Sequence, residues 1–153
     1  MHPTLTPLPA MGRVLLALIF VLSGVGKIGA VGATSAHMAS AGIPYSNDLV
    51  WGAVALELGG GILLIVGFLT RLVGLALFFY TLTLAVLFHA YWSMSGAAAH
   101  SQYSIFFEHI AIAGGMLYVV AFGAGPYSID AMIWGRRSAP TAVLPPPHPQ
   151  PAE

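Results

Sequence analysis

Residues 55–77 read ALELGGGILLIVGFLTRLVGLAL, and this stretch indicates how the chain folds. It contains the end of one apolar run, Leu49–Leu69, which a single acid, Glu57, interrupts, and the start of the next, Leu72–Phe88. Each run approaches the ~20 residues that a helix needs to cross a ~30 Å hydrocarbon core. The dipeptide Thr70–Arg71 is all that separates them. Two membrane helices joined by so tight a turn must form an antiparallel hairpin.

Two further apolar runs flank this hairpin. The first covers Val14–Ile28 and continues through small residues, and the last covers about Ile105–Phe122. None of the four runs shows the alternating pattern of a barrel strand, and in lipid the remaining structure that satisfies every backbone group is a helix. We therefore predict an all-α integral membrane protein, a four-helix antiparallel bundle with helices at about 13–32, 49–69, 72–90 and 104–123.

Composition excludes a soluble domain. Of the 153 residues, 58% are hydrophobic and 7% are charged, and the mean hydropathy is +0.85, whereas about a quarter of the residues of a soluble domain are charged. The net charge of zero provides no basic field for nucleic acid. The absence of cysteine excludes disulfides, thiolate metal sites and iron–sulfur clusters. His37 and His100 have no recognised ligand spacing, so we predict no metal site.

Basic residues predict the orientation. With four spans, the N-terminus, the turn between the second and third helices and the C-terminal tail share one side of the membrane. Arg13, Arg71, Arg136 and Arg137 all fall on that side, and Lys27 is the one basic residue elsewhere. The positive-inside rule then places both termini in the cytoplasm.

These boundaries divide the chain into three parts. A cytoplasmic tail covers residues 1–12, and the membrane domain covers residues 13–135, including a short interfacial helix at about 127–135. The proline-rich residues 136–153 are expected to form a disordered cytoplasmic tail.

Ionisable residues occur inside the predicted helices at similar depths. Lys27 lies 14 residues after Arg13 and Glu57 lies 14 residues before Arg71, so the helical rise puts both ~21 Å above the cytoplasmic boundary. Glu108, on the fourth helix, comes to ~22 Å by the same count. An unpaired carboxylate at such depth costs ~2.5–3.5 kcal/mol, so we predict a Lys27–Glu57 ion pair inside the bundle.

Small residues lie beside these charges at helical spacing, and they let helix backbones approach closely. They are Ser23 and Gly24 before Lys27, Gly60 and Gly61 after Glu57, and Ala111 and Gly115 after Glu108. All three faces are therefore expected to point into the bundle. His109 is next to Glu108, and His89 lies higher, at ~27 Å. A haem would need these two histidines at one depth, so their estimated offset argues against one.

Each charge also has a purely structural interpretation. A lone lysine near a helix end commonly extends its amine to the interface as an anchor, and Lys27 is compatible with that role. A buried Lys27–Glu57 pair is compatible with helix packing alone. His89 and Glu108 lie near helix ends, where a hydrated interface would account for them.

The order of the motifs resembles the DoxX family of small bacterial membrane proteins. The matching pieces are RVLLALIFVLSGVGKI at 13–28, the quoted stretch at 55–77, FHAYW at 88–92, the GGML run at 114–117 and FGAGPYSID at 122–130. The resemblance covers about residues 11–135. It implies a four-helix bundle in the bacterial inner membrane. It also implies association with redox systems: thiosulfate–quinone oxidoreduction, terminal oxidases and oxidative-stress complexes.

The resemblance extends to individual residues. Lys27 matches the family's Ser-Gly-x-x-Lys motif, Glu57 matches its glutamate in the second helix, and His89 with Trp92 matches its Phe-His-x-x-Trp feature. The fourth helix departs from the family, because Glu108-His109 stands where many members have Lys-Asn. This exchange reverses a charge of the cluster.

Two functions follow as hypotheses. In the first, the chain is an accessory subunit of a quinone-linked oxidoreductase or respiratory-type complex, and a polar cluster in the outer half of the membrane binds a lipid quinone head group or handles protons. The candidate residues are Lys27, Glu57, His89, Trp92, Glu108 and His109. In the second, the chain is a non-catalytic structural or assembly subunit that packs against a larger complex. The expected partners in both are the bilayer and other membrane subunits.

Overall fold

The structure is a computed structural model that describes residues 7–135. Within that range four helical spans are long and apolar enough to cross a membrane, and no strand occurs. The elements are α1 (Leu8–Gly29), α2 (Val31–Ser40), α3 (Ser46–Val54), the π-helical turn η1 (Ala55–Gly59), α4 (Gly60–Val66), α5 (Thr70–Phe88), the 3₁₀ turn η2 (Tyr91–Ser93), α6 (Gly96–Phe122) and α7 (Ile129–Trp134). The second span is formed by α3, η1 and α4 together, and the predicted all-α membrane fold is confirmed.

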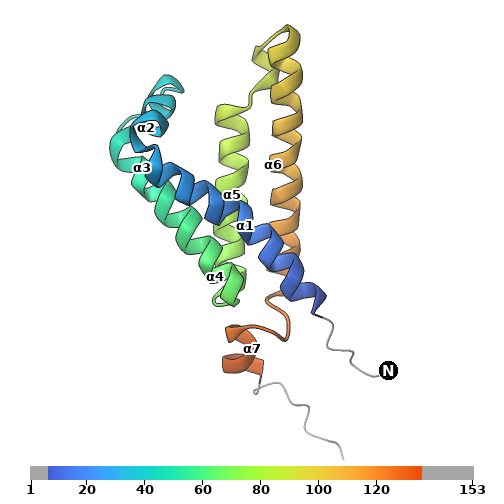
Figure 1. Cartoon of the computed structure of the whole chain (residues 1–153). Helices are drawn as coiled ribbons and strands as arrows, with labels where there is room; N and C mark the ends of the chain where they lie inside the picture. Colours follow the sequence, from blue (N-terminus) through green and yellow to red (C-terminus); the bar gives the residue numbers. More distant parts are fainter. Residues whose placement is uncertain (1–6, 136–153) are drawn as a thin grey trace, which may run out of the picture.

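The spans form two pairs that converge at one end and diverge at the other (Figure 1). In the first pair α1 packs along α3, η1 and α4, and in the second α5 packs along α6. The hydrophobic core lies where the pairs converge, and it includes Phe20 of α1, Leu64 of α4, Leu77 of α5 and Met116 of α6. Beyond this core the pairs separate, which leaves the inner faces of their upper halves free to form a site.

The start of α1, the turn between α4 and α5, and α7 all lie at the converging end (Figure 1). Asp130 fastens α7 there, because its carboxylate accepts hydrogen bonds from the backbone N–H groups of Leu69 (2.8 Å) and Thr70 (2.9 Å). In the turn, Gly67 has a φ of +69°, and a Cβ at this position would lie 2.5 Å from the Ser128 Cβ. Both the backbone conformation and the close approach therefore require glycine. The assignment of this end to the cytoplasm stays a prediction.

Several boundaries differ from the predicted ones. α1 begins at Leu8 instead of residue 13, because the proline in its first turn, Pro9, suits the start of a helix. α2 forms largely in the segment between the first two predicted helices, after a break at Ala30, whose φ is −136°. α6 begins at Gly96 instead of residue 104, because the alanines that follow are the strongest helix formers. The proline-rich tail and residues 1–6 lie outside the described residues.

Candidate functional site

Lys27 of α1 and Glu57 of η1 form an ion pair, as their matched depths predicted. The Lys27 Nζ lies 2.9 Å and 2.8 Å from the two carboxylate oxygens of Glu57, and it also donates to the Ser23 Oγ at 2.6 Å. The side chain of Glu57 is 2% exposed and that of Lys27 is 21% exposed. The lysine therefore points inward toward its partner and is not an interfacial anchor.

A third residue, Tyr80 of α5, completes the group and was not predicted. Its hydroxyl donates to the Glu57 Oε1 at 2.7 Å, so the buried carboxylate is held by side chains from both helix pairs. Burial of a carboxylate is costly unless it is paired in this way. The available signal was a phenol in the middle of an apolar run, whereas membrane tyrosines are enriched at the interfaces. We call Lys27, Glu57 and Tyr80 the ion-pair cluster.

Glu57 lies at the centre of the π-helical turn. Such turns interrupt α-helices for a single turn and frequently coincide with functional sites. The backbone of α1 comes close to this turn, since a Cβ on Gly24 would lie 3.0 Å from the backbone nitrogen of Leu58. Gly24 and Gly61 lie buried between the first two spans and Gly60 lies buried against Leu77 of α5, so these small-residue faces point into the bundle as predicted.

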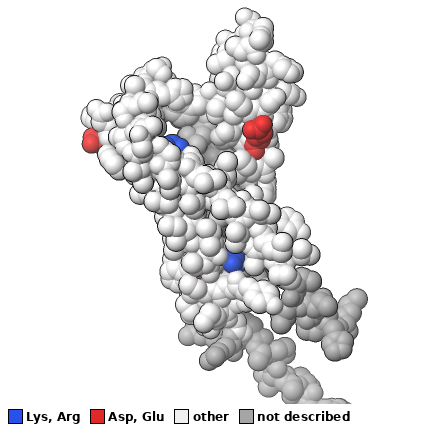
Figure 2. Space-filling view, viewed as in Figure 1, with Lys and Arg blue, Asp and Glu red and all other residues white. Residues whose placement is uncertain are grey.

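A cleft of about 510 Å³ lies between the two helix pairs, with Ser23, Lys27 and Tyr80 in its lining. Figure 2 shows the hollow between the upper lobes, with a basic group visible inside it. Most of the remaining lining is apolar: Met38, Ile43, Leu49, Leu56, Leu84, Leu87 and Phe88. An apolar space with a few convergent polar groups is typical of a binding site for a small molecule.

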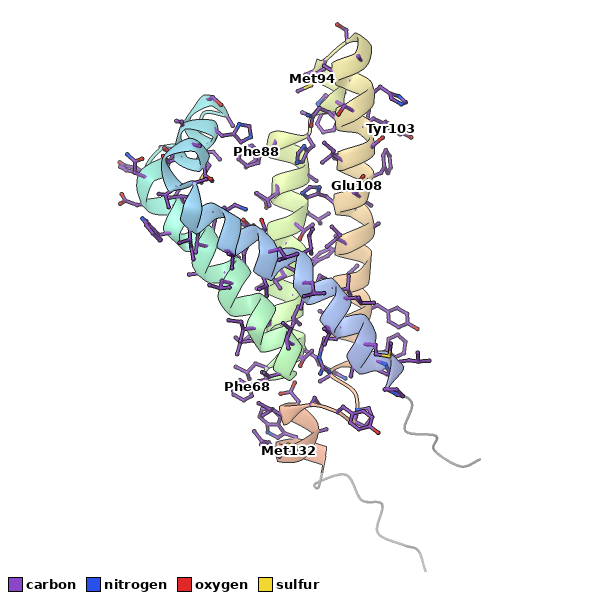
Figure 3. The ribbon with its side chains drawn as sticks, viewed as in Figure 1. Phe68, Phe88, Met94, Tyr103, Glu108 and Met132 are labelled. Atoms are coloured by element: carbon purple, nitrogen blue, oxygen red, sulfur yellow. The ribbon has the colours of Figure 1, made fainter. Side chains whose placement is uncertain are left out.

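Two rings connect the walls of this cleft. His37 of α2 and Phe88 at the end of α5 stack with their centroids 5.0 Å apart and their planes at 27° (Figure 3). Both residues belong to the cleft lining. The contact joins the two diverging helix pairs on the side away from the core, so it limits how far the cleft opens there.

A smaller cavity of about 60 Å³ adjoins the ion-pair cluster, with Glu57, Tyr80 and Thr81 in its lining. This volume has room for a few water molecules. Four residues line both this cavity and the cleft: Ser23, Tyr80, Leu84 and His109. Polar groups of three of them therefore stand between the cleft and the water-sized cavity beside Glu57.

His89 and His109 lie together, which corrects the predicted difference in depth. Their ring centroids are 4.7 Å apart. The helical count failed because α5 ends at Phe88, and His89 adopts a non-helical φ of −124° that redirects its side chain. The Nδ1 of His109 lies 2.9 Å from the carbonyl oxygen of Ile105, and the Nδ1 of His89 lies 2.7 Å from the Gln102 Oε1. Both acceptors are oxygens, so each Nδ1 is the donor and each Nε2 remains available.

Glu108 and Trp92 lie outside the cluster, contrary to the sequence hypothesis. Glu108 and Ala111 are exposed on α6, whose buried face carries Ala113, Met116 and Val119. Glu108 precedes Ala113 by five residues and so is rotated away from that face, whereas the four-residue spacing of His109 keeps it inward. Trp92 is 58% exposed. It packs instead against Tyr91 and Phe106, with ring centroids 5.2 Å and 5.6 Å away.

Arg13, predicted only as a boundary charge, is also a buried residue that packs at the converging end of the bundle. It is 3% exposed. Its guanidinium donates to the carbonyl oxygens of Tyr127 (2.8 Å) and Ile65 (3.3 Å) and to that of Ala124. Ile65 lies near the end of the second span, and Ala124 and Tyr127 lie in the connection between α6 and α7, so Arg13 joins α1 to both at the converging end of the bundle. A lone arginine at the start of an apolar run gives no signal that distinguishes this role from a boundary charge.

Within residues 7–135, no three His, Cys, Asp or Glu side chains gather closely enough to hold a metal ion.

The fold and the site together define a small multi-pass membrane protein with a buried ion-pair cluster beside an amphiphilic cleft.

The chain belongs to the DoxX family, whose family model matches residues 8–90. It is 35% identical over 120 residues to inner membrane protein YphA of Escherichia coli (strain K12), which covers 78% of this chain and 86% of that protein. It is also 35% identical over 124 residues to inner membrane protein YqjF of the same organism, which covers 80% and 89% respectively. No solved structure matches. The relatives and the four apolar spans place the protein in the inner membrane.

Proposed function

We propose that the cleft binds the head group of a lipid quinone and that the protein is an accessory subunit of a quinone-linked membrane oxidoreductase. The observation that supports this most directly is the ion-pair cluster at the edge of a cleft of about 510 Å³ whose remaining lining is mostly apolar. A quinone head group presents two carbonyl acceptors on a flat apolar ring with an apolar tail. The cleft offers the positive charge of Lys27 beside a quinone carbonyl and leucine side chains for the ring and tail.

Proton handling would fall to the residues between the cleft and the small cavity. Conversion of a quinone to a quinol consumes two electrons and two protons, and in this proposal a redox-active partner subunit supplies the electrons. Glu57 is ionised in its pair with Lys27 and accepts the Tyr80 hydroxyl, so Tyr80 can pass a proton to the quinone only when Glu57 has taken up a replacement proton from the small cavity that it lines. His109 lines both spaces and has its Nε2 available, so it connects the cleft with water beside Glu57.

The test fills the cleft without straining the helix that lines it. Gly52 lines the cleft, and a Cβ there would meet no atom within 4 Å, so Gly52→Leu adds bulk at the cleft lining without a clash at its Cβ. Gly114→Leu is the matched control, since Gly114 is equally unobstructed but exposed on α6. Purified protein in detergent is titrated calorimetrically with a short-chain ubiquinone. We expect saturable one-to-one binding by the wild type and Gly114→Leu, and at least tenfold weaker binding by Gly52→Leu. Equal affinities in all three, or no saturable binding by the wild type, would reject the proposal.

A structural or assembly role is the second candidate, and one observation favours it. The Lys27 amine donates to Ser23 and to both Glu57 oxygens, so the pair is satisfied within the chain and needs no ligand. In a strain that lacks this protein, Gly52→Leu separates the two roles. Restored assembly with restored turnover of the partner complex indicates the structural role, whereas restored assembly without quinone-dependent turnover indicates the binding role.

A further inference from the structure

A second concave surface lies at the converging end of the bundle, away from the cleft. A groove of about 570 Å³ runs between α1 and α6 and is lined by Gly12 and Leu16 on one side and Gly115, Tyr118 and Phe122 on the other. The one charged residue in its lining is Arg13. Because Arg13 is 3% exposed and bonded to backbone carbonyls, the groove presents an apolar surface to whatever occupies it.

The dimensions of the groove match one leaflet of a bilayer. Gly115 and Gly123 mark its extent along α6, and eight residues of helix rise by about 12 Å. Half of a ~30 Å hydrocarbon core is ~15 Å, so a groove of this length accommodates much of one acyl chain. Tyr118 and Phe122 are 67% and 69% exposed, and their rings lie 4.4 Å apart, which forms a continuous aromatic wall.

A cation lies where this groove ends. A second hollow, of about 600 Å³, shares Phe122 and Gly123 with the groove and has Arg71 in its lining. The Arg71 Nε would lie 3.4 Å from a Cβ built on Gly123, so its side chain rests against the residue that both spaces share. Arg71 is exposed, and the one salt bridge within residues 7–135 joins Lys27 and Glu57, which leaves Arg71 without an acidic partner there.

The acid nearest to this hollow is already engaged. Asp130 belongs to the same lining, but its two carboxylate oxygens accept the backbone N–H groups of Leu69 and Thr70. Trp134 also lines the hollow, and indole rings favour the head-group level of a membrane. An apolar groove of one-leaflet length that ends at an unpaired guanidinium and an indole is complementary to a lipid with an anionic head group.

We propose that this surface binds one anionic glycerophospholipid, with an acyl chain in the α1–α6 groove and the phosphate at Arg71. A guanidinium pairs with phosphate through two parallel hydrogen bonds. The head group of a zwitterionic lipid carries its own cation, which competes for the phosphate, whereas that of an anionic lipid does not. Arg71 should therefore bind the anionic lipid more strongly. The bound lipid would cover the seam between the first and fourth spans and so hold the two helix pairs together. The proposal is independent of what the cleft binds.

Native mass spectrometry of the whole protein in mild detergent tests it, with phosphatidylglycerol and phosphatidylcholine added in equal amounts. We expect the wild type to retain one phosphatidylglycerol at least tenfold more strongly than phosphatidylcholine. Arg71→Gln should abolish this preference, and Arg71→Lys should preserve most of it because the charge remains.

A groove-filling variant provides the second arm. No atom lies within 4 Å of a Cβ on Gly12, so Gly12→Leu occupies the groove without a clash and should reduce retention of both lipids. Gly26→Leu, in the same helix, equally unobstructed and outside the groove, should behave as the wild type. Equal retention of the two lipids by the wild type, or unchanged phosphatidylglycerol retention in both Arg71→Gln and Gly12→Leu, would overturn the proposal.

Discussion

Among individual residues, Glu57 is the charge whose burial depends most on its partners. It is 2% exposed in the middle of an apolar span. The Lys27 ammonium balances its charge, and the Tyr80 hydroxyl donates a hydrogen bond to it. Removing a single member of such a buried pair leaves the other charge without compensation, whereas removing both charges leaves no buried charge uncompensated. The stability of the first helix pair should therefore depend on the two residues jointly and not on either one alone.

Single substitutions in the pair should consequently cost more than the double substitution. Lys27→Met and Glu57→Gln are each expected to destabilise the protein by roughly 3–5 kcal/mol, the usual cost of breaking a buried pair. The double variant should recover part of that loss. Thermal unfolding in detergent measures all four proteins, and Gly26→Leu serves as an uncharged control on α1. Strictly additive losses would show that the two residues do not interact.

Predictability from sequence also varied from residue to residue. The Lys27–Glu57 pair was predictable because helical rise converts sequence distance into depth, and opposite charges at one depth in lipid must meet. The contact of Tyr80 with Glu57 was not predicted, because the depth of a residue does not show which way its side chain faces. Glu108 was wrongly placed in the cluster for the same reason. Glu108 and His109 are adjacent in α6, but only His109 faces inward. Counting residues does not show which of two neighbours faces the bundle when the helix is apolar on all sides.

Among the elements, the most constrained is the short connection between α4 and α5. Gly67 and Leu69 both have positive φ, at 69° and 49°. The connection is held from α7 by Asp130 and from α1 by Arg13, whose Cζ would lie 3.0 Å from a Cβ on Gly67. The turn lies at 67–69, and Thr70 and Arg71 begin α5. The sequence predicted a tight turn slightly later, at Thr70–Arg71, because these two polar residues separate two apolar runs of membrane length. It did not predict the π turn or α2, since both depend on how α1 packs against the second span.

Two of the glycines with positive φ, Gly42 and Gly67, offer a matched comparison. Gly42 has a φ of +79° and no atom within 4 Å of a built Cβ, whereas the same Cβ on Gly67 meets the Ser128 Cβ at 2.5 Å. Gly42→Ala should cost about 1–2 kcal/mol from backbone strain alone. Gly67→Ala carries the same strain together with the clash and should destabilise the protein clearly more. Thermal unfolding of both variants checks the order, and equal losses would show that α7 does not pack against the turn.

For the whole molecule, the two helix pairs share a core at one end and a single ring stack at the other. The start of α1 and the residues of α7 emerge on the core side (Figure 1). Arg71 and the turn lie on the same side, so the positive-inside rule predicts that this side faces the cytoplasm and that the cleft lies in the outer half of the membrane.

This orientation is testable with single cysteines, because the natural chain has none. Ser101→Cys, exposed on the far end of α6, should react with a membrane-impermeant maleimide in intact cells. Gly135→Cys, exposed after α7, should react only after the membrane is permeabilised. The parent protein is the blank. The reverse labelling pattern would invert the topology and move the cleft to the cytoplasmic half.

Lys27 is also the sole lysine among the 153 residues. Isotopic labelling of lysine therefore places one magnetic resonance signal on the amine that joins the cleft to Glu57, with no other side-chain amine to overlap it. Any molecule that enters the cleft changes the surroundings of that nucleus and shifts its signal. The protein thus carries a built-in spectroscopic reporter at its candidate site, and a library of unmodified compounds can be screened against it without an assay for turnover.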